Sequence, residues 1–139
     1  MIVDASVAIK WIVREDELDV RALAIRDGEE RLEAPDLILP EVLNIAWKKW
    51  RLGQMTQQET ETGFVSILNI LEVIHPVAEL YRRAMALAFA LDHPAYDCFY
   101  IACAEAAGAV LVTADRRLCD AAARGGLGDF VRHLAEIPP

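Results

Sequence analysis

The chain opens with Met1-Ile2-Val3-Asp4-Ala5-Ser6, a short apolar and β-branched run that stops at an aspartate. This pattern is typical of a buried strand entering a turn, and helical spacing follows at Val7 and Trp11. A second apolar run at Ala109–Val112 precedes a helical pattern at Asp115–Arg124. Short apolar strands separated by helices imply βαβ units, so the sequence predicts an α/β fold with helices on both faces of a parallel sheet.

The rest of the chain shows the same alternation. Thr56 and Glu59 form a capping box that opens a helix, and Gly108 is placed to end another. Further strands are expected at residues 31–36, 73–74 and 130–134, and further helices at 18–30, 38–52, 78–91 and 95–107. No internal repeat or long linker is present, so a single domain over residues 1–139 is expected.

Composition narrows the function classes. With 139 residues the chain has the size of one domain, and 55% hydrophobic residues supply ample material for a core. Fourteen Lys and Arg against 22 Asp and Glu give a net charge of −8. This balance argues against nucleic-acid binding by bulk electrostatics, so a nucleic-acid role would need a local basic patch or a bridging metal ion.

The cysteines and the apolar runs indicate the compartment. Cys98, Cys103 and Cys119 are odd in number and lack CxxC spacing, which predicts neither a disulfide framework nor a zinc site and favours a reducing cytoplasm. The first residues carry no basic leader, and Asp4 interrupts the apolar run, so export is not expected. Apolar runs such as Ala84–Leu91 are too short to span a membrane.

Two acids follow predicted strands. Asp4 comes directly after Ile2 and Val3, and Asp115 comes shortly after Val112. Open parallel sheets bind their ligands at the carboxyl ends of strands, so both acids are candidate site residues. When each acid is taken alone, helix capping is the better explanation, because Asp is favoured at helix starts.

Two more acids lie on predicted helices. Glu41 follows Pro40 in a first turn, and helical spacing aligns it with Asn44 and Lys48 along one polar line, which either faces solvent or serves a site. Asp97 lies at the start of a helix that is apolar nearly all round. A buried carboxylate there must be paired, protonated or metal-bound, which favours a functional role.

These four acids converge if the strands and helices close as predicted. Like charges at short range repel, so such a cluster needs a cation or raised pKa values at neutral pH. An oxygen-rich site suits Mg²⁺ or Mn²⁺, with Ser6 and Thr113 orienting the carboxylates or fixing water. The reaction that such a site serves is attack of a metal-activated water on phosphorus.

The order and spacing of these residues resemble the PIN-domain ribonucleases, and within them the VapC-type toxins of prokaryotic toxin–antitoxin pairs. The resemblance covers nearly the whole chain. It is carried by Asp4-Ala5-Ser6, by Pro40-Glu41 with Asn44, by Tyr96-Asp97 with Tyr100, Ala102 and Ala104, and by Thr113-Ala114-Asp115.

The resemblance implies a three-layer α/β/α sandwich whose central, mostly parallel sheet has four to five strands. It also implies a metal-dependent endoribonuclease that uses Mg²⁺ or Mn²⁺, forms a homodimer and is inhibited by a small, VapB-like antitoxin. The metal-binding catalytic acids would be Asp4, Glu41, Asp97 and Asp115, supported by Ser6, Asn44 and Thr113. Whether the nearby Asp92 joins the site is open.

An acidic pocket needs basic neighbours to accept RNA. Lys10, Arg116 and Arg117 are close in sequence to the proposed acids and are candidates for phosphate contact. Arg82 and Arg83 are interpreted as a solvated face. The three histidines are too scattered for a zinc set and are interpreted as structural or exposed, and Cys98 and Cys103 as inert core thiols.

Surplus apolar surface suggests a protein partner. The helices that begin at Leu18 and Thr56 have apolar faces larger than one small sheet covers. A groove for an antitoxin helix or a dimer contact is therefore expected. Trp47 and Trp50 recur at helical spacing with Leu43, which favours core or interface packing over base stacking.

Two other function classes fit parts of the pattern. A receiver-like signalling domain also clusters acids around Mg²⁺, but it needs a Lys after a late strand, and Asp115 is instead followed by Arg116. A catalytically silent module of the PIN type that binds RNA or protein is the third possibility, which acids at all four positions disfavour.

Overall fold

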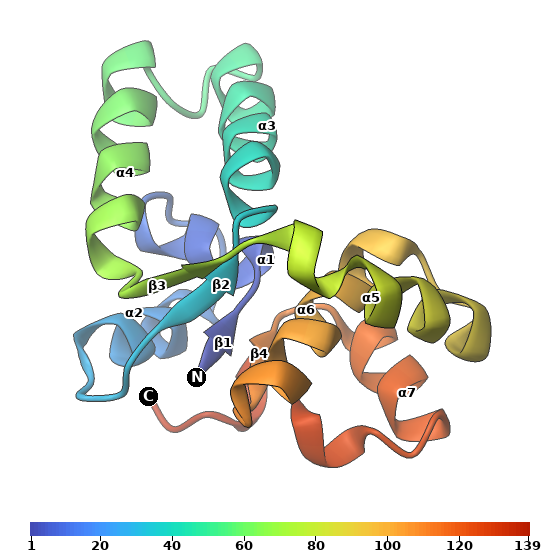
Figure 1. Ribbon diagram of the computed structural model, residues 1–139. Helices are drawn as coiled ribbons and strands as arrows, with labels where there is room; N and C mark the ends of the chain where they lie inside the picture. Colours follow the sequence, from blue (N-terminus) through green and yellow to red (C-terminus); the bar gives the residue numbers. More distant parts are fainter.

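Five short strands pair in parallel in the order β3-β2-β1-β4-β5 in the computed structural model, which describes residues 1–139 (Figure 1). Val3 pairs with Val112 across the two central strands, and Ile2 pairs with Glu33 on the other side. The predicted parallel sheet is therefore confirmed, with the upper number of expected strands. The strands are β1 Ile2–Val3, β2 Glu33–Pro35, β3 Val73–His75, β4 Leu111–Thr113 and β5 Val131–His133.

Seven α-helices connect and cover the strands. The chain steps from β1 to β2 to β3 in one direction and returns through β4 to β5 in the other. Right-handed crossovers therefore place the first four helices on one face and the last three on the opposite face, which gives the predicted three layers. The helices are α1 Ala5–Ala8, α2 Asp19–Asp27, α3 Ile38–Arg51, α4 Gln57–Ile70, α5 Val77–Leu91, α6 Ala95–Ala107 and α7 Arg116–Arg124.

Two helices stand out in the arrangement. Figure 1 shows α3 and α4 side by side as a hairpin that projects beyond the sheet. Helix α6 contacts β1, β2 and β4 and is itself covered by α5. Its buried residues include Cys98, Tyr100 and Ile101, which join the strands in one hydrophobic core. None of the helices combines the length and apolar character needed to cross a membrane.

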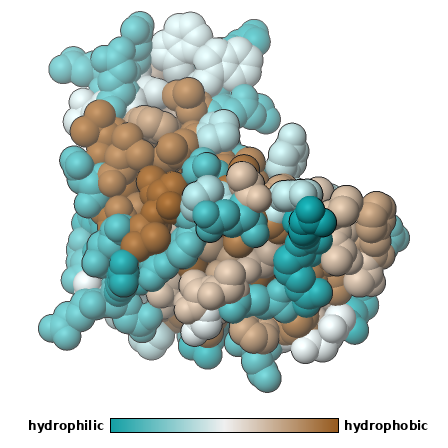
Figure 2. All heavy atoms as spheres, in the orientation of Figure 1, coloured by the Kyte–Doolittle hydropathy of each residue, from teal (hydrophilic) through white to brown (hydrophobic).

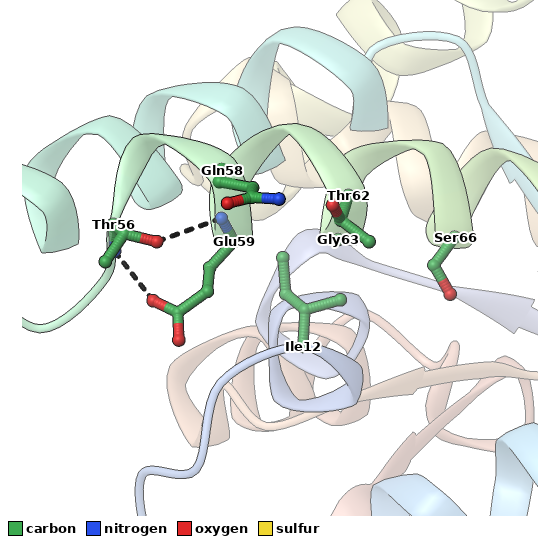
Figure 3. A pocket seen from close by; sticks show the side chains of 7 residues that line it. All are labelled: Ile12, Thr56, Gln58, Glu59, Thr62, Gly63 and Ser66. Atoms are coloured by element: carbon green, nitrogen blue, oxygen red, sulfur yellow. Dashed lines mark hydrogen bonds between the residues drawn. The ribbon is translucent and has the colours of Figure 1, made fainter.

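The helix ends follow the sequence signals closely. Thr56 and Glu59 form the predicted capping box, in which each side chain accepts the other residue's backbone N–H (Figure 3). Gly108 ends α6 in the left-handed region with φ of 60°, a conformation that favours glycine. The fourth strand begins later than predicted because the backbone N–H of Ala109 still closes α6 by bonding the carbonyl of Ala104.

The topology creates a crevice beside the central strand. After β1 and after β4 the chain leaves toward opposite faces of the sheet, so the carboxyl ends of these neighbouring strands form a switch point. Asp4 follows β1 directly, and Ala114 and Asp115 follow β4. The fold thus brings two of the predicted site acids to the place where a doubly wound sheet binds ligands.

Candidate active site

Asp4 is the most deeply buried acid of the site, with 7% of its surface exposed. Its Oδ1 accepts hydrogen bonds from the Ser6 hydroxyl at 2.6 Å and the Val7 backbone N–H at 3.1 Å, and its Oδ2 accepts the Thr113 hydroxyl at 2.5 Å. Burial raises the pKa of Asp4 to about 6, against the opposing effect of these hydrogen bonds and with a contribution from the charge of Asp97. Asp4 therefore caps α1, and burial disfavours its ionised form.

Two hydroxyl groups tie the turn after β1 to the turn after β4. The Ser6 hydroxyl donates to Asp4 and accepts the Ala114 N–H at 2.9 Å. The Thr113 hydroxyl donates to Asp4 and accepts the Asp115 N–H at 2.9 Å. Each hydroxyl uses its donor on the carboxylate and an acceptor lone pair on the facing loop, so Asp4 and the loop that carries Asp115 are held in one frame.

Asp97 lies in the first turn of α6 with its side chain 31% exposed. Its Oδ2 lies 2.7 Å from the Nε2 of His93, so the paired state expected for this carboxylate is present, although Asp97 is less buried than Tyr100–Ala104 of the same helix. Desolvation raises the pKa of Asp97, the hydrogen bond and charge of His93 lower it, and the charge of Asp115 raises it.

Glu41 lies in the first turn of α3 and accepts a short hydrogen bond from the Tyr100 hydroxyl. Tyr100 is only 2% exposed, and it lies one helical turn after Asp97, so both face the same side of α6. Burial raises the pKa of Glu41, the Tyr100 bond opposes that rise, and the charge of Asp97 adds to it. Asn44 is exposed and makes no hydrogen bond to these acids.

The four acids interact electrostatically around Asp97. Its charge raises the pKa of both Asp4 and Glu41, and the charge of Asp115 in turn raises the pKa of Asp97. No three Asp, Glu, His or Cys side chains lie close enough, as they stand, to hold a metal ion. The acids are thus neighbours that repel one another across the switch point, and their carboxylate oxygens are the donors that Mg²⁺ and Mn²⁺ prefer.

A polar cavity of about 390 Å³ opens beside two of these acids. Asp97 and Asp115 lie in its wall together with two exposed arginines of α7, Arg117 and Arg124, neither of which forms an ion pair. The remaining lining residues are His93, Pro94 and Asp120. An unpaired guanidinium beside carboxylates suits a ligand that carries phosphate groups and can bridge to a cation.

Comparison with known proteins agrees with this geometry. The sequence model of the PIN domain family matches residues 1–124, which is most of the chain. This chain belongs to the PIN-domain family. It is 31% identical over 122 residues to the protein named Ribonuclease VapC3 from Pyrobaculum aerophilum, covering 86% of this chain and 92% of that one. It is 28% identical over 120 residues to Ribonuclease VapC9 from Mycobacterium tuberculosis, covering 86% and 89%.

The fold is shared with a solved structure. A crystal structure of PAE2754 from Pyrobaculum aerophilum superposes with a TM-score of 0.69 at 24% identity, covering 96% of this chain and 88% of that one. The predicted α/β/α sandwich is therefore also that of an experimentally determined protein. Membership of the PIN-domain family overturns the receiver-like alternative.

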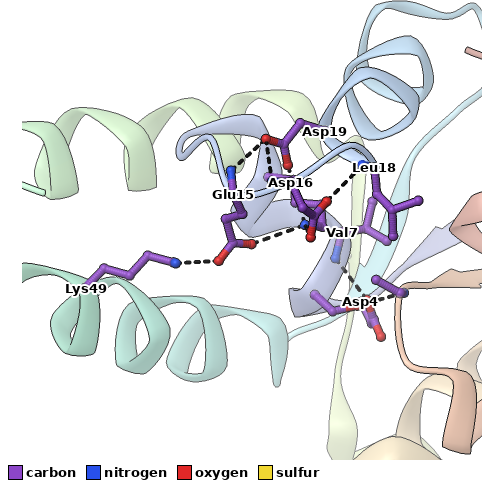
Figure 4. A network of polar contacts seen from close by, with 10 residues as sticks. Asp4, Val7, Glu15, Asp16, Leu18, Asp19 and Lys49 are labelled. Atoms are coloured by element: carbon purple, nitrogen blue, oxygen red, sulfur yellow. Dashed lines mark hydrogen bonds and ion pairs between the residues drawn. The ribbon is translucent and has the colours of Figure 1, made fainter. Parts of the chain in front are cut away.

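The structure of this PIN domain corrects the interpretation of Lys10. Its side chain is 4% exposed, and its ammonium group contacts Glu15 at 3.3 Å, Asp16 at 2.8 Å and Asp19 at 3.4 Å. Glu15 also pairs with Lys49 of α3 (Figure 4). Lys10 is unavailable to a phosphate because protein carboxylates surround it, and the network instead joins the first helical turns to α2 and α3.

Arg116, Arg117 and Asp92 have different surroundings. Arg116 is exposed and contacts the buried ring of His133 at 3.4 Å, whereas Arg117 lines the polar cavity. Asp92 ends α5 in the left-handed region with φ of 48° and does not line that cavity. The cavity wall therefore includes Arg117, Arg116 contacts His133 instead, and Asp92 is exposed and its side chain forms no hydrogen bond or ion pair.

Two residues of the site were not predicted as functional. Tyr100 lies in an apolar helix, where an aromatic side chain is read as core, and only its spacing of three residues from Asp97 could have revealed its contact with Glu41. His93 is interpreted from the sequence as structural or exposed, although its spacing of four residues before Asp97 allows the pairing that the structure shows.

Proposed function

We propose that this PIN domain is the endoribonuclease toxin of a toxin–antitoxin pair and hydrolyses RNA phosphodiester bonds with the help of Mg²⁺ or Mn²⁺. The observation that carries this proposal is geometric: Ser6 and Thr113 hold Asp4 against the loop that carries Asp115, and Asp115 shares a cavity wall with Asp97. The relatives named as ribonucleases cover nearly the whole domain, which supports the same activity here.

The residues fit a divalent cation in donor type and in electrostatics. Asp4, Glu41, Asp97 and Asp115 would hold it, since all offer carboxylate oxygens and three of them have raised pKa values. When bound, the cation supplies positive charge for the developing phosphorane and favours ionisation of the attacking water. Mg²⁺ and Mn²⁺ share this preference for oxygen ligands.

The protein's own part is to hold the acids in place. Ser6 and Thr113 fix both oxygens of Asp4, and Tyr100 fixes one oxygen of Glu41. The guanidinium of Arg117 is free to bind a phosphate next to the scissile one, with Arg124 two helical turns further along α7 on the same cavity wall. Arg116 is proposed as an outer contact to the same strand of RNA.

Exposed apolar side chains support the proposed protein partners. Leu43, Trp47 and Trp50 are about half exposed and line a cavity of about 230 Å³ between α3 and α4. Figure 2 shows hydrophobic residues gathered on this hairpin. We propose this surface as the docking site of a small antitoxin helix, and the exposed Tyr81 and Phe89 of α5 as part of a homodimer contact. Three free cysteines suit the proposed cytoplasmic location.

The test is cleavage of RNA by the purified chain. We expect cleavage with Mg²⁺ or Mn²⁺, loss of cleavage with a chelator, and a loss of at least about 100-fold in Asp4→Asn and Asp97→Asn. Asp92→Asn is the matched control and should retain activity, because Asp92 is exposed and is not among the charges that raise the pKa values of Asp4, Glu41 and Asp97. A metal-binding chain that cleaves no RNA would support the silent module, and unchanged activity in both site variants would overturn the mechanism.

A further inference from the structure

Three helices of the chain have a carboxylate at the third position after the N-cap: Glu59 in α4, Glu79 in α5 and Asp97 in α6. In α4 this residue is Glu59, and its carboxylate folds back to accept the Thr56 N–H at 2.7 Å (Figure 3). In α5 and α6 the N-cap is a proline, Pro76 or Pro94, and only Asp97 of α6 has a histidine partner for its carboxylate. Proline has no backbone N–H, so the reciprocal bond of a capping box is impossible there. The carboxylate of Asp97 therefore forms no capping hydrogen bond with its own helix.

His93 takes up one oxygen of that carboxylate. Its Nε2 lies 2.7 Å from Oδ2, while Oδ1 has no hydrogen-bond partner in the protein. The imidazole is 12% exposed and is held from the preceding helix, because the His93 N–H bonds the Ala88 carbonyl and Asp92 turns the chain through the left-handed region. Both side chains line the polar cavity beside Asp115.

We propose that the His93-Pro94 pair positions Asp97 for the divalent cation: Pro94 denies the carboxylate its usual cap, and His93 fixes Oδ2 so that Oδ1 stays free. This inference rests on the proposed function. Asp97 is the acid that interacts with all three others, so its orientation affects the whole site. Partners of metal-binding carboxylates typically change metal affinity by about 10- to 100-fold when they are removed.

The test measures binding of Mn²⁺ alone, without RNA, by electron paramagnetic resonance of the free ion. We expect His93→Ala to weaken Mn²⁺ binding about 10-fold or more. His93→Gln, whose amide nitrogen can replace Nε2, should recover most of the affinity. Pro94→Ala should also weaken binding, because it restores an N–H that competes for the Asp97 carboxylate.

A second histidine–carboxylate pair provides the control. His75 of the edge strand β3 lies 2.6 Å from Glu33 of β2, so His75→Ala removes the same kind of contact away from the acids and should leave Mn²⁺ affinity unchanged. Equal weakening by His75→Ala, or no weakening by His93→Ala, would overturn the positioning role.

Two further outcomes of this experiment separate the positioning role from the proposed function. If His93→Ala unfolds below the assay temperature, Pro94→Ala decides, since weaker binding supports the role and unchanged binding overturns it. If the wild-type chain binds Mn²⁺ and cleaves RNA, and His93→Ala does both equally well, the positioning role is overturned and the proposed function is not. A wild-type chain that does neither overturns the proposed function, and the positioning role with it.

Discussion

At the scale of single residues, Asp4 shows how this site balances stability against function. The carboxylate is buried and its pKa is raised from 3.8 to about 6, so its ionisation opposes folding in the absence of a cation. Because the folded-state pKa is the higher one, the protein loses stability as pH rises from about 4 to about 6, and the loss remains at neutral pH. A bound cation would reverse this cost.

Replacing the charge should therefore stabilise the metal-free protein. Asp4→Asn keeps an oxygen for Ser6 and Val7, and we expect it to raise the free energy of unfolding by about 2 kcal/mol at pH 7.5 and by about half as much at pH 5. Urea denaturation in chelator at both pH values measures this. A less stable variant at pH 7.5 would show that the ionised carboxylate contributes to folding.

Tyr100 offers a second test at this scale. Tyr100→Phe removes the only side-chain donor to Glu41, and we expect a cost of about 1 kcal/mol in stability together with several-fold lower cleavage activity. Tyr96→Phe, on an exposed side chain in the same helix, is the control and should change neither quantity. Full activity in Tyr100→Phe would remove the tyrosine from the site.

Residue types predicted the acids and also Ser6 and Thr113, the hydroxyl partners of Asp4, but not the partners of Glu41 and Asp97. Asp4, Glu41, Asp97 and Asp115 stand out because charges next to apolar runs need an explanation. Lys10 was misassigned because nearness to Asp4 in sequence says nothing about which way a side chain points, and a tight turn brings Glu15 and Asp16 onto it. Tyr100 was missed because a tyrosine in an apolar helix is expected to be a core residue. The sequence does not show that its hydroxyl group contacts Glu41.

At the scale of elements, the turns that follow the two central strands are joined by hydroxyl groups, beyond the last paired residues Val3 and Val112. Thr113 both donates to Asp4 and accepts from the Asp115 N–H, so it couples the start of α1 to the start of α7. The turn after β4 should therefore lose its order when this hydroxyl is removed, even though threonine and valine have nearly the same shape.

We expect Thr113→Val to cost about 2 to 3 kcal/mol, because it leaves a buried carboxylate oxygen without its donor and an N–H without its acceptor. The matched control is Thr56→Val, which removes an exposed helix cap and should cost about 1 kcal/mol. Urea denaturation compares them. Equal costs would mean that the bridge adds nothing beyond an ordinary cap.

The Lys10 network gives a prediction on a different pair of elements. Lys10→Met leaves the buried Asp19 without its cation, and we expect a loss of about 3 kcal/mol in stability. RNA affinity of the folded protein should be unchanged, since Lys10 does not reach the cavity. Weaker RNA binding in a folded Lys10→Met would restore the phosphate-contact interpretation.

Element boundaries were predictable where a backbone signal is local. The capping box at Thr56 and the glycine after Ala107 define helix ends by chemistry within four residues. The second helix is shorter than predicted, because Gly28 ends it in an extended conformation before the acidic residues that follow. The sequence predicted that the strands pair in parallel but not the order of the strands in the sheet. That order depends on crossovers that no short motif specifies.

At the scale of the whole molecule, a chain of net charge −8 must bind a polyanion through a local surface. The wall formed by Arg117 and Arg124 is such a surface, since neither guanidinium pairs with a protein carboxylate. Each phosphate contact adds about 0.7 to the slope of log affinity against log salt for single-stranded RNA.

Arg117→Gln should therefore weaken RNA binding and lower that slope by about 0.7, with little effect on metal binding. Arg82→Gln is the control, because Arg82 lies over the ring of Tyr81 on α5 and not at the cavity. Fluorescence anisotropy over a salt series measures both variants. A slope that is the same in wild type and Arg117→Gln would place the RNA elsewhere.

The central claim is that acids from distant parts of the chain share one divalent cation. Anomalous diffraction from crystals soaked in Mn²⁺ tests it most directly. We predict a peak at coordination distance from Asp97 and from at least one of Asp4, Glu41 and Asp115. Full Mn²⁺ occupancy at other acids, with no peak at this cluster, would contradict it.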